Sequence, residues 1–202
     1  MTYQQALKYL YKLERFGIRL GLNKIKRVLK LLGNPQDKLK IIHIAGTNGK
    51  GSTAAFTASI LQEAGYQVGL YTSPHLVDFR ERIQINGQPV SSRQVAKLFS
   101  RIRSKAPNHG LTYFEFTTIA AFLHFVRHKV DFAVIEVGLG GRLDATNAIK
   151  NNLAAVITNV DFDHTEYLGR TLEKIAFEKA GIIREKGTVI NGSDQKEAIK
   201  VI

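Results

Sequence analysis

The stretch that decides the fold is KIIHIAGTNGKGST, residues 40–53. A short apolar run, 40–45, leads into a glycine-rich turn, and a helical pattern then extends from Ser52 to about Glu63. Because glycine has no Cβ, backbone N–H groups in such a turn can approach phosphate oxygens, and the start of the following helix adds partial positive charge. This order predicts a strand, a phosphate-binding loop and a helix.

The predicted nucleotide-binding loop contains glycines, a lysine and hydroxyls, namely Gly46, Thr47, Asn48, Gly49, Lys50, Gly51, Ser52 and Thr53. Lys50 can reach the terminal phosphates of a nucleotide, and the hydroxyl of Ser52 or Thr53 can meet Mg²⁺. The spacing departs from G-x-x-x-x-G-K-[ST], because only two residues separate Gly46 from Gly49. An ordinary strand–helix turn is the alternative, but it gives the lysine and the hydroxyls no role.

Further apolar runs and helical patterns alternate along the chain. We expect strands at 67–71, 131–136, 153–158 and 187–191, a hairpin at 82–90 around Asn86-Gly87, and helices at 3–16, 23–32, 92–104, 114–128, 171–180 and from about Ser193. Strands that alternate with helices favour an α/β fold, a P-loop NTPase-like and mostly parallel sheet with helices on both faces. We expect an N-terminal helical segment, 1–39, followed by an ATP-binding domain, 40–202.

Composition narrows the class of protein. The 202 residues are 44% hydrophobic and 23% charged, with no cysteine and no apolar run long enough to span a membrane. With no signal-like start, these features predict a cytoplasmic protein without thiolate chemistry. Residues 1–40 carry +8 of the net charge of +12, a field that attracts anions or simply faces solvent. A basic nucleic-acid-binding module is a competing interpretation, but no motif supports it, so we expect no nucleic-acid partner.

Three chemically reactive segments follow predicted strands. Glu136 ends one strand, Asp161-Phe162-Asp163-His164 follows another, and Ser73-Pro74-His75 follows a third. Carboxyl ends of parallel strands meet at one edge of a sheet, where ligands bind. Glu136 there could hold Mg²⁺, whereas His75 and His164 taken alone are as readily structural. Lys179, near the end of a predicted helix, is by spacing alone an ordinary exposed lysine.

Seven ordered segments carry a family resemblance. They are HIAGTNGKGS (43–52), GLYTSPHL (69–76), ERIQING (81–87), TYFEF (112–116), EVGLGGRLDATN (136–147), DHTEYLG (163–169) and FEKAGIIR (177–184). Together they resemble the N-terminal part of the Mur ligase superfamily, most closely its folylpolyglutamate synthase and dihydrofolate synthase branch. One glycine-rich loop would be weak support, but several long matches in order are specific.

The resemblance implies site roles. Lys50, Lys179 and His164 would be catalytic, with Lys179 carbamylated, and Ser52, Ser73, Glu136 and His164 would ligate Mg²⁺. A pterin-bearing substrate would lie near Gly21, Leu22, Thr112, Tyr113 and Phe114, while Arg142 and Asp144 would shape the phosphate side.

The resemblance also implies an activity. ATP would activate a folate or dihydropteroate carboxylate as an acyl phosphate, and L-glutamate would attack it to form an amide, with ATP and Mg²⁺ required. A C-terminal ligase domain is absent from the sequence and the chain looks truncated, so we expect this chain alone to be inactive, and we expect a monomer. The alternative is a generic P-loop small-molecule phosphotransferase. It shares Lys50 and Glu136 but gives no reason for Ser73, His164 and Lys179 to coincide.

Overall fold

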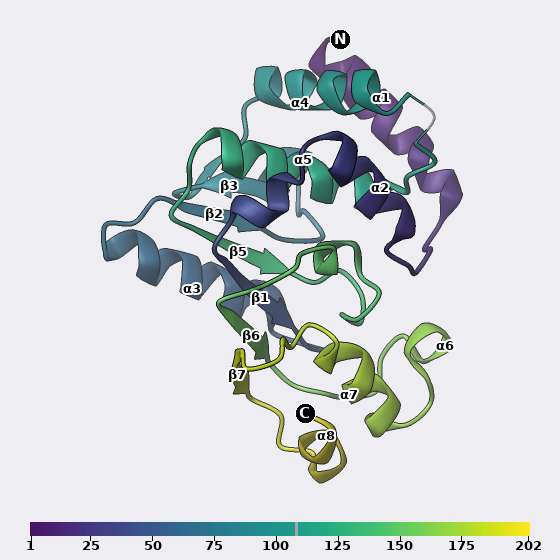
Figure 1. Cartoon of the computed structure of the whole chain (residues 1–202), viewed down its shortest axis with the longest axis vertical. Coiled ribbons are helices and arrows are strands. Elements are labelled where there is room, and N and C mark those ends of the chain that lie inside the picture. Colours follow the sequence, from purple (N-terminus) through teal and green to yellow (C-terminus); the bar gives the residue numbers. More distant parts are fainter. Residues whose placement is uncertain (108) are drawn as a thin grey trace.

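A seven-stranded sheet forms the centre of the molecule in the computed structural model, which describes residues 1–107 and 109–202 (Figure 1). The strand order is β4-β3-β2-β5-β1-β6-β7. The strands are β1 (Ile41–Ala45), β2 (Val68–Tyr71), β3 (Ile83–Ile85), β4 (Gln88–Pro89), β5 (Phe132–Glu136), β6 (Ala154–Ile157) and β7 (Thr188–Asn191). This confirms the predicted α/β class with a mostly parallel sheet.

Parallel pairing brings the carboxyl ends of five strands to one edge. β2, β5, β1, β6 and β7 run parallel, with Ile44 of β1 in register with Glu136 of β5 and Val156 of β6. The β3–β4 hairpin adds the antiparallel edge. Its Asn86-Gly87 turn has φ of 47° and 71°, the left-handed conformation that this dipeptide favours. The loops after β1, β2, β5 and β6 therefore start at neighbouring points.

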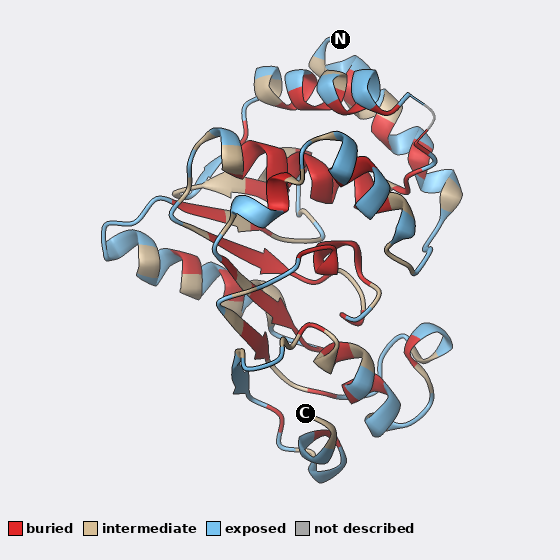
Figure 2. Ribbon diagram, in the orientation of Figure 1, coloured by how far each residue is buried: buried red, intermediate tan, exposed pale blue. Residues whose placement is uncertain are grey.

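Helices cover both faces of the sheet. The longer ones are α3 (Lys50–Glu63), α4 (Ser92–Lys105) and α5 (Tyr113–Arg127), and the shorter ones are α1 (Tyr3–Tyr11), α2 (Asn23–Leu31), α6 (Thr165–Leu168), α7 (Leu172–Ala180) and α8 (Lys196–Val201). Helix α5 is buried along most of its length and separates the sheet from α1, α2 and α4 (Figures 1 and 2). On the other face, Ala54 and Ala58 of α3 pack against Ile44 and Val134.

The N-terminal segment shares the largest core. Leu10 of α1 and Val28 and Leu29 of α2 belong to the same buried cluster as Phe116 and Phe122 of α5. Short 3₁₀ turns connect these elements, η1 (Lys12–Phe16), η2 (Pro35–Lys38), η3 (Phe79–Arg82) and η4 (Ala145–Asn147).

Several boundaries differ from the sequence expectation. The helix expected at 3–16 ends at Tyr11 and continues as the 3₁₀ turn η1, which stops at Gly17 (φ 59°). Helix α3 begins at Lys50 rather than Ser52, because Gly49 adopts φ of 76° as its N-cap. The last helix begins at Lys196 rather than near Ser193, and the one-turn helix α6 was not expected.

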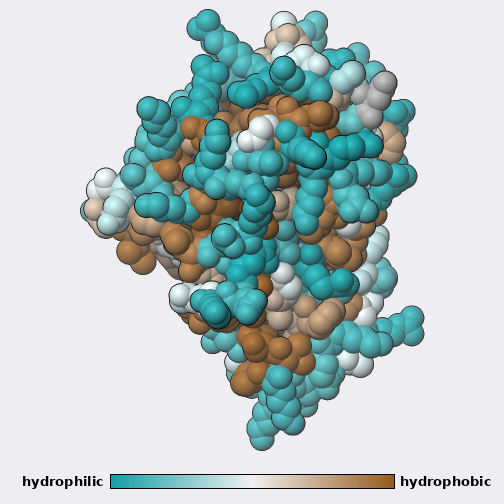
Figure 3. Space-filling model, in the orientation of Figure 1, coloured by the Kyte–Doolittle hydropathy of each residue, from teal (hydrophilic) through white to brown (hydrophobic). Residues whose placement is uncertain are grey.

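Residues at the β7 end of the sheet are more exposed to solvent than those of the central strands. All residues of β7 are exposed, and Figure 3 shows apolar side chains gathered near α3 and near the β7–α8 end. Phe56 and Ile60 of α3 and Ile190 of β7 are among the exposed apolar residues. Within the described ranges, no helix combines the length and apolar character needed to cross a membrane.

Candidate nucleotide and substrate site

The glycine-rich loop 46–49 joins β1 to α3 in a conformation that needs glycine. Gly46 has φ of 153°, and a Cβ there would collide with the Thr158 hydroxyl. Gly49 has φ of 76° and is the N-cap of α3. The loop therefore presents backbone and a free helix N-terminus without side-chain obstruction, as phosphate binding requires.

The loop after β6 braces this glycine-rich loop. Asn159 accepts from the Thr47 N–H through its carbonyl (3.0 Å) and from the Asn48 N–H through Oδ1 (2.8 Å). The Thr158 hydroxyl donates to the Asn48 carbonyl at 2.6 Å. Thr47 Oγ1 donates to the Asp161 carbonyl at 3.1 Å and accepts from the Asp161 N–H at 3.0 Å. These contacts fix the loop from its β6 side.

Glu136 and Ser73 meet the start of α3. The Ser73 N–H donates to Glu136 Oε2 at 2.7 Å, and a Cβ on Gly51 would lie 3.6 Å from Glu136 Oε1. Burial raises the pKa of Glu136, which is 4% exposed, while the Ser73 N–H and the positive charges of Lys50 and Arg82 oppose the rise. The structure thus brings together the loop, Ser73 and Glu136, as the topology predicted.

Two lysines lie at the same edge. Lys50 Nζ donates to the Thr47 carbonyl at 2.9 Å, folding back over its own loop. Lys179, on α7, is 2% exposed, so it is not the exposed lysine that its spacing alone suggested. Burial, together with the charge of Lys50, lowers the pKa of Lys179 to about 8, and the charge of Asp163 partly opposes this shift. Lys179 therefore lies within electrostatic range of the glycine-rich loop.

His164 occupies the left-handed N-cap position of α6, with φ of 47°. Its half-exposed ring lies 3.6 Å from Asp163 Oδ2 and 4.0 Å from Glu166 Oε1, so its charged contacts are with its sequence neighbours rather than with Glu136. Within residues 1–107 and 109–202, no group of three or more His, Asp or Glu side chains is placed to hold a metal ion. The Mg²⁺ ligands Ser52, Ser73, Glu136 and His164 stay a prediction.

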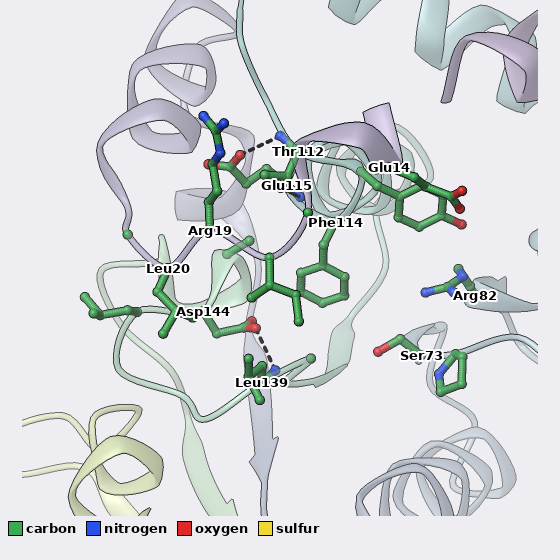
Figure 4. Close-up of a pocket in the computed structure, with 18 of the residues that line it drawn as sticks. Glu14, Arg19, Leu20, Ser73, Arg82, Thr112, Phe114, Glu115, Leu139 and Asp144 are labelled. Carbon is green, nitrogen blue, oxygen red and sulfur yellow. Dashed lines mark hydrogen bonds between the residues drawn. The ribbon is translucent and has the colours of Figure 1, made fainter. Parts of the chain in front are cut away.

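A cavity of about 490 Å³ opens beside Ser73 (Figure 4). Its walls come from η1 and the segment after it, the loop after β2, the start of α5 and the loop after β5. The lining residues are Glu14, Gly17, Ile18, Arg19, Leu20, Gly21, Ser73, Pro74, His75, Arg82, Thr112, Tyr113, Phe114, Glu115, Gly138, Leu139, Leu143, Asp144 and Ala145. Of the predicted substrate residues, Gly21, Thr112, Tyr113 and Phe114 line the cavity. Leu22 instead packs against the large core.

Close packing shapes the cavity wall after β5. A Cβ on Gly138 would lie 2.5 Å from the Phe114 ring, so glycine is required for the two walls to meet. The Asp144 carboxylate accepts from the Leu139 N–H (2.9 Å) and from the Thr146 hydroxyl (2.5 Å). Burial raises the pKa of Asp144, and these hydrogen bonds oppose the rise. Asp144 is thus a buried carboxyl group, held by its own loop, in the wall of the cavity.

Arg142 is not among the residues that line the cavity, and its side chain contacts α7 instead. Its guanidinium forms an ion pair with Glu178 at 2.7 Å and lies 5.2 Å from the centre of the Phe177 ring. Sequence reasoning gave no role to Arg82 and His75, which both line the cavity, although both belong to the quoted segments. The sequence signal that could have pointed to Arg82 is its position directly before the apolar strand β3, where a charged side chain needs a partner.

Fold and site together define a class: an α/β domain whose glycine-rich loop, which has the geometry of a phosphate-binding loop, follows β1, the middle one of the five parallel strands. The sequence matches the Mur ligase middle domain over residues 44–201, and the chain belongs to this family.

Within this family, the chain is similar to dihydrofolate and folylpolyglutamate synthases. The chain is 44% identical, over its whole length, to the dihydrofolate synthase/folylpolyglutamate synthase of Bacillus subtilis, and 44% identical over 92% of its length to the dihydrofolate synthetase of Saccharomyces cerevisiae. It covers 48% and 45% of these two proteins, so it spans about half the length of the curated relatives it matches.

Solved structures of proteins from the same group have a similar fold. The chain resembles E. coli FolC in complex with DHPP and ADP, with a TM-score of 0.94 at 39% identity, covering all of this chain and 49% of that one. It also resembles an FPGS-AMPPCP-folate complex, with a TM-score of 0.92 at 37% identity, covering all of this chain and half of the other.

Proposed function

We propose that this chain supplies the ATP-binding and folate- or dihydropteroate-binding part of an ATP-dependent ligase that forms an amide with L-glutamate. The observation that carries the proposal is the junction at Ser73. Its N–H binds Glu136 beside the start of α3, while the same residue lines the 490 Å³ cavity. A carboxylate held in the cavity would thus face the end of a nucleotide held by the loop.

The chemistry needs such a junction. A carboxylate oxygen attacks the γ-phosphorus of ATP, the bond to the bridging oxygen breaks, and ADP leaves to give an acyl phosphate. The glutamate amine then attacks the acyl carbon, loses a proton, and phosphate departs as the amide forms. In this proposal the backbone N–H groups at the start of α3, residues 49–51, and the Lys50 ammonium stabilise charge on the transferring phosphoryl group, while the N–H groups of Thr47 and Asn48 hold the loop to Asn159.

In this proposal, Mg²⁺ would be held by Ser52, Ser73, Glu136 and His164. Oxygen ligands suit Mg²⁺, and a buried Glu136 carboxylate at the start of α3 fits a cation at the phosphates. Bound there, Mg²⁺ would neutralise negative charge on the phosphates.

Lys179 fits the proposed carbamylated lysine. A neutral amine reacts with CO₂ to give a carbamate and a proton, and its lowered pKa, about 8, makes that neutral form accessible near neutral pH. The carbamate would place an anion, in place of a cation, near Lys50 and the phosphate loop.

The cavity fits a flat aromatic substrate. Phe114 and Tyr113 supply aromatic faces on which a pterin ring could stack. The proposed substrates are therefore a folate or dihydropteroate, ATP and L-glutamate.

Binding measurements test this proposal, because the sequence predicts negligible turnover by the 202-residue chain. Calorimetric titration should show binding of AMP-PCP with Mg²⁺, and of dihydropteroate to the AMP-PCP-loaded chain. Lys50→Ala should weaken AMP-PCP binding by about 10-fold or more, because it removes a charge-assisted contact to phosphate.

Lys174→Ala is the matched control, since Lys174 is exposed on α7. It should leave both affinities unchanged. A chain that binds AMP-PCP but not dihydropteroate would contradict the ligase and favour the phosphotransferase alternative.

A further inference from the structure

Arg82 is a buried arginine on the cavity wall that the proposed function has not used. It ends η3, is 8% exposed, and its backbone carbonyl accepts from the Thr72 N–H at 3.1 Å, next to Ser73. Its Nε donates to His75 Nδ1 at 2.8 Å. The backbone of Arg82 and the Nε of its side chain are thus fixed, so the guanidinium has a defined position in the cavity.

The guanidinium forms no ion pair within 4 Å in the described part of the chain, although its charge acts at longer range on the buried Glu136. Its two terminal nitrogens make no hydrogen bond to the described residues. Figure 4 shows Arg82 extending into the cavity from the side opposite Leu20, above Ser73. Because a charge removed from water is costly unless it is paired, these nitrogens suit an anionic ligand group.

The surroundings select the kind of anion. The Tyr113 ring centre lies 5.3 Å from the guanidinium carbon, and the Tyr113 hydroxyl is buried without a hydrogen-bond partner in the described chain. These groups belong to the aromatic cavity rather than to the phosphate loop, where Lys50 already supplies a cation. A carboxylate on an aromatic ligand fits this position, and its other side would face Ser73 and Glu136.

We propose that Arg82 binds the substrate carboxylate that is to be activated, and that His75 is a positioning residue that orients the guanidinium. The proposal rests on the proposed function, since it assigns the residue that presents the acceptor to ATP. A planar guanidinium can bind both carboxylate oxygens through two parallel N–H donors. Arg82 would thereby aim the acceptor at the nucleotide.

The test compares two ligands and two proteins, all loaded with AMP-PCP and Mg²⁺. The ligands are dihydropteroate and its carboxamide analogue, which lacks the charge. We expect the wild-type chain to prefer the carboxylate by about 10- to 100-fold. Arg82→Gln should reduce that preference to about 2-fold or less while leaving AMP-PCP affinity unchanged, a coupling that a purely structural defect would not produce.

His75 is tested in the same way. His75→Ala removes the acceptor for Arg82 Nε and should lower the carboxylate preference, whereas His75→Asn, which retains an acceptor oxygen, should restore part of it. Arg80→Gln is the matched control, because Arg80 lies on the same 3₁₀ turn but pairs with Asp78 outside the cavity. It should preserve the wild-type preference.

The outcomes separate the two proposals. If the wild-type chain binds neither ligand, the proposed function fails. If it prefers the carboxylate and Arg82→Gln keeps that preference, only the role of Arg82 fails. If Arg82→Gln weakens AMP-PCP instead, Arg82 serves the phosphate and the proposal is overturned. Should Arg82→Gln not fold by circular dichroism, Arg82→Lys replaces it, and a retained preference in both Arg82→Lys and His75→Ala overturns the proposal.

Discussion

Buried ionisable side chains mark the candidate site at the scale of single residues. Burial raises the pKa values of Glu136 and Asp144 and lowers that of Lys179, so burial makes the charged form of each group less favourable than it is in water. Such shifts are common where charged ligands bind, because ligand charges supply the missing partners. Lys179 lends itself best to measurement, since its pKa shift is large.

Lys179 should make stability depend on pH in a defined window. Its folded pKa of about 8 lies below the ordinary lysine value of 10.5, so the folded chain releases this proton first. The cost of burying the ammonium is complete below about pH 8 and disappears as the pH rises towards 10.5. In CO₂-free buffer, Lys179→Met should therefore raise the free energy of unfolding at pH 7, by up to about 3 kcal/mol.

The measurement is urea unfolding of wild type and Lys179→Met at several pH values, from 7 to 10.5. The advantage of the variant should shrink above about pH 8, because the wild-type amine is then increasingly neutral in the folded chain while the unfolded chain still binds the proton. Lys174→Met, on the exposed side of α7, should show no such trend. A stability difference that does not vary with pH would argue against a depressed pKa.

At the scale of elements, the glycine-rich loop depends on the segment after β6. Asn159 binds two consecutive N–H groups of the loop, those of Thr47 and Asn48, and no residue of the loop itself replaces these bonds. The side-chain bond of Asn159 can be removed while its backbone bond stays. Asn159→Ala should therefore loosen the loop without unfolding the sheet.

We expect Asn159→Ala to weaken AMP-PCP binding by about 10-fold, because a looser loop must be ordered on binding. Hydrogen exchange at residues 46–50 should accelerate, while global stability should fall by only about 1 kcal/mol. Calorimetry and exchange mass spectrometry would measure both effects. Asn151→Ala, at an exposed position before β6, is the control. Unchanged exchange in the loop of Asn159→Ala would disprove the bracing role.

The strands of this fold were predictable because they are continuous apolar runs, and their parallel order placed Ser73 and Glu136 at one edge. Element ends were less predictable. The start of α3 depends on the φ of Gly49, and the exposed strand β7 is defined by pairing with β6. Arg82 and His75 face the cavity only because η3 turns beside Ser73, a tertiary arrangement that spacing does not encode.

At the scale of the whole molecule, the cavity is built between the N-terminal segment and the sheet. Glu14, Arg19 and Leu20 form one wall, and the loops after β2 and β5 form the other. The segment is anchored by burying α1 and α2 in the core of α4 and α5. Cavity shape and fold stability therefore depend on the same contacts.

Leu10 tests this dependence. It is fully buried in α1 within the core that α5 shares, whereas Leu31 of α2 is 58% exposed. Leu10→Ala should lower the free energy of unfolding by about 2–5 kcal/mol, because it leaves a cavity in a packed core, and Leu31→Ala should change it by less than about 0.5 kcal/mol. Since the core is continuous, thermal unfolding followed by circular dichroism should stay a single transition, and exchange protection should fall in α5 as well as in α1. A separate early transition confined to residues 1–39 would show that the segment folds independently, and the cavity would then lack a stable wall.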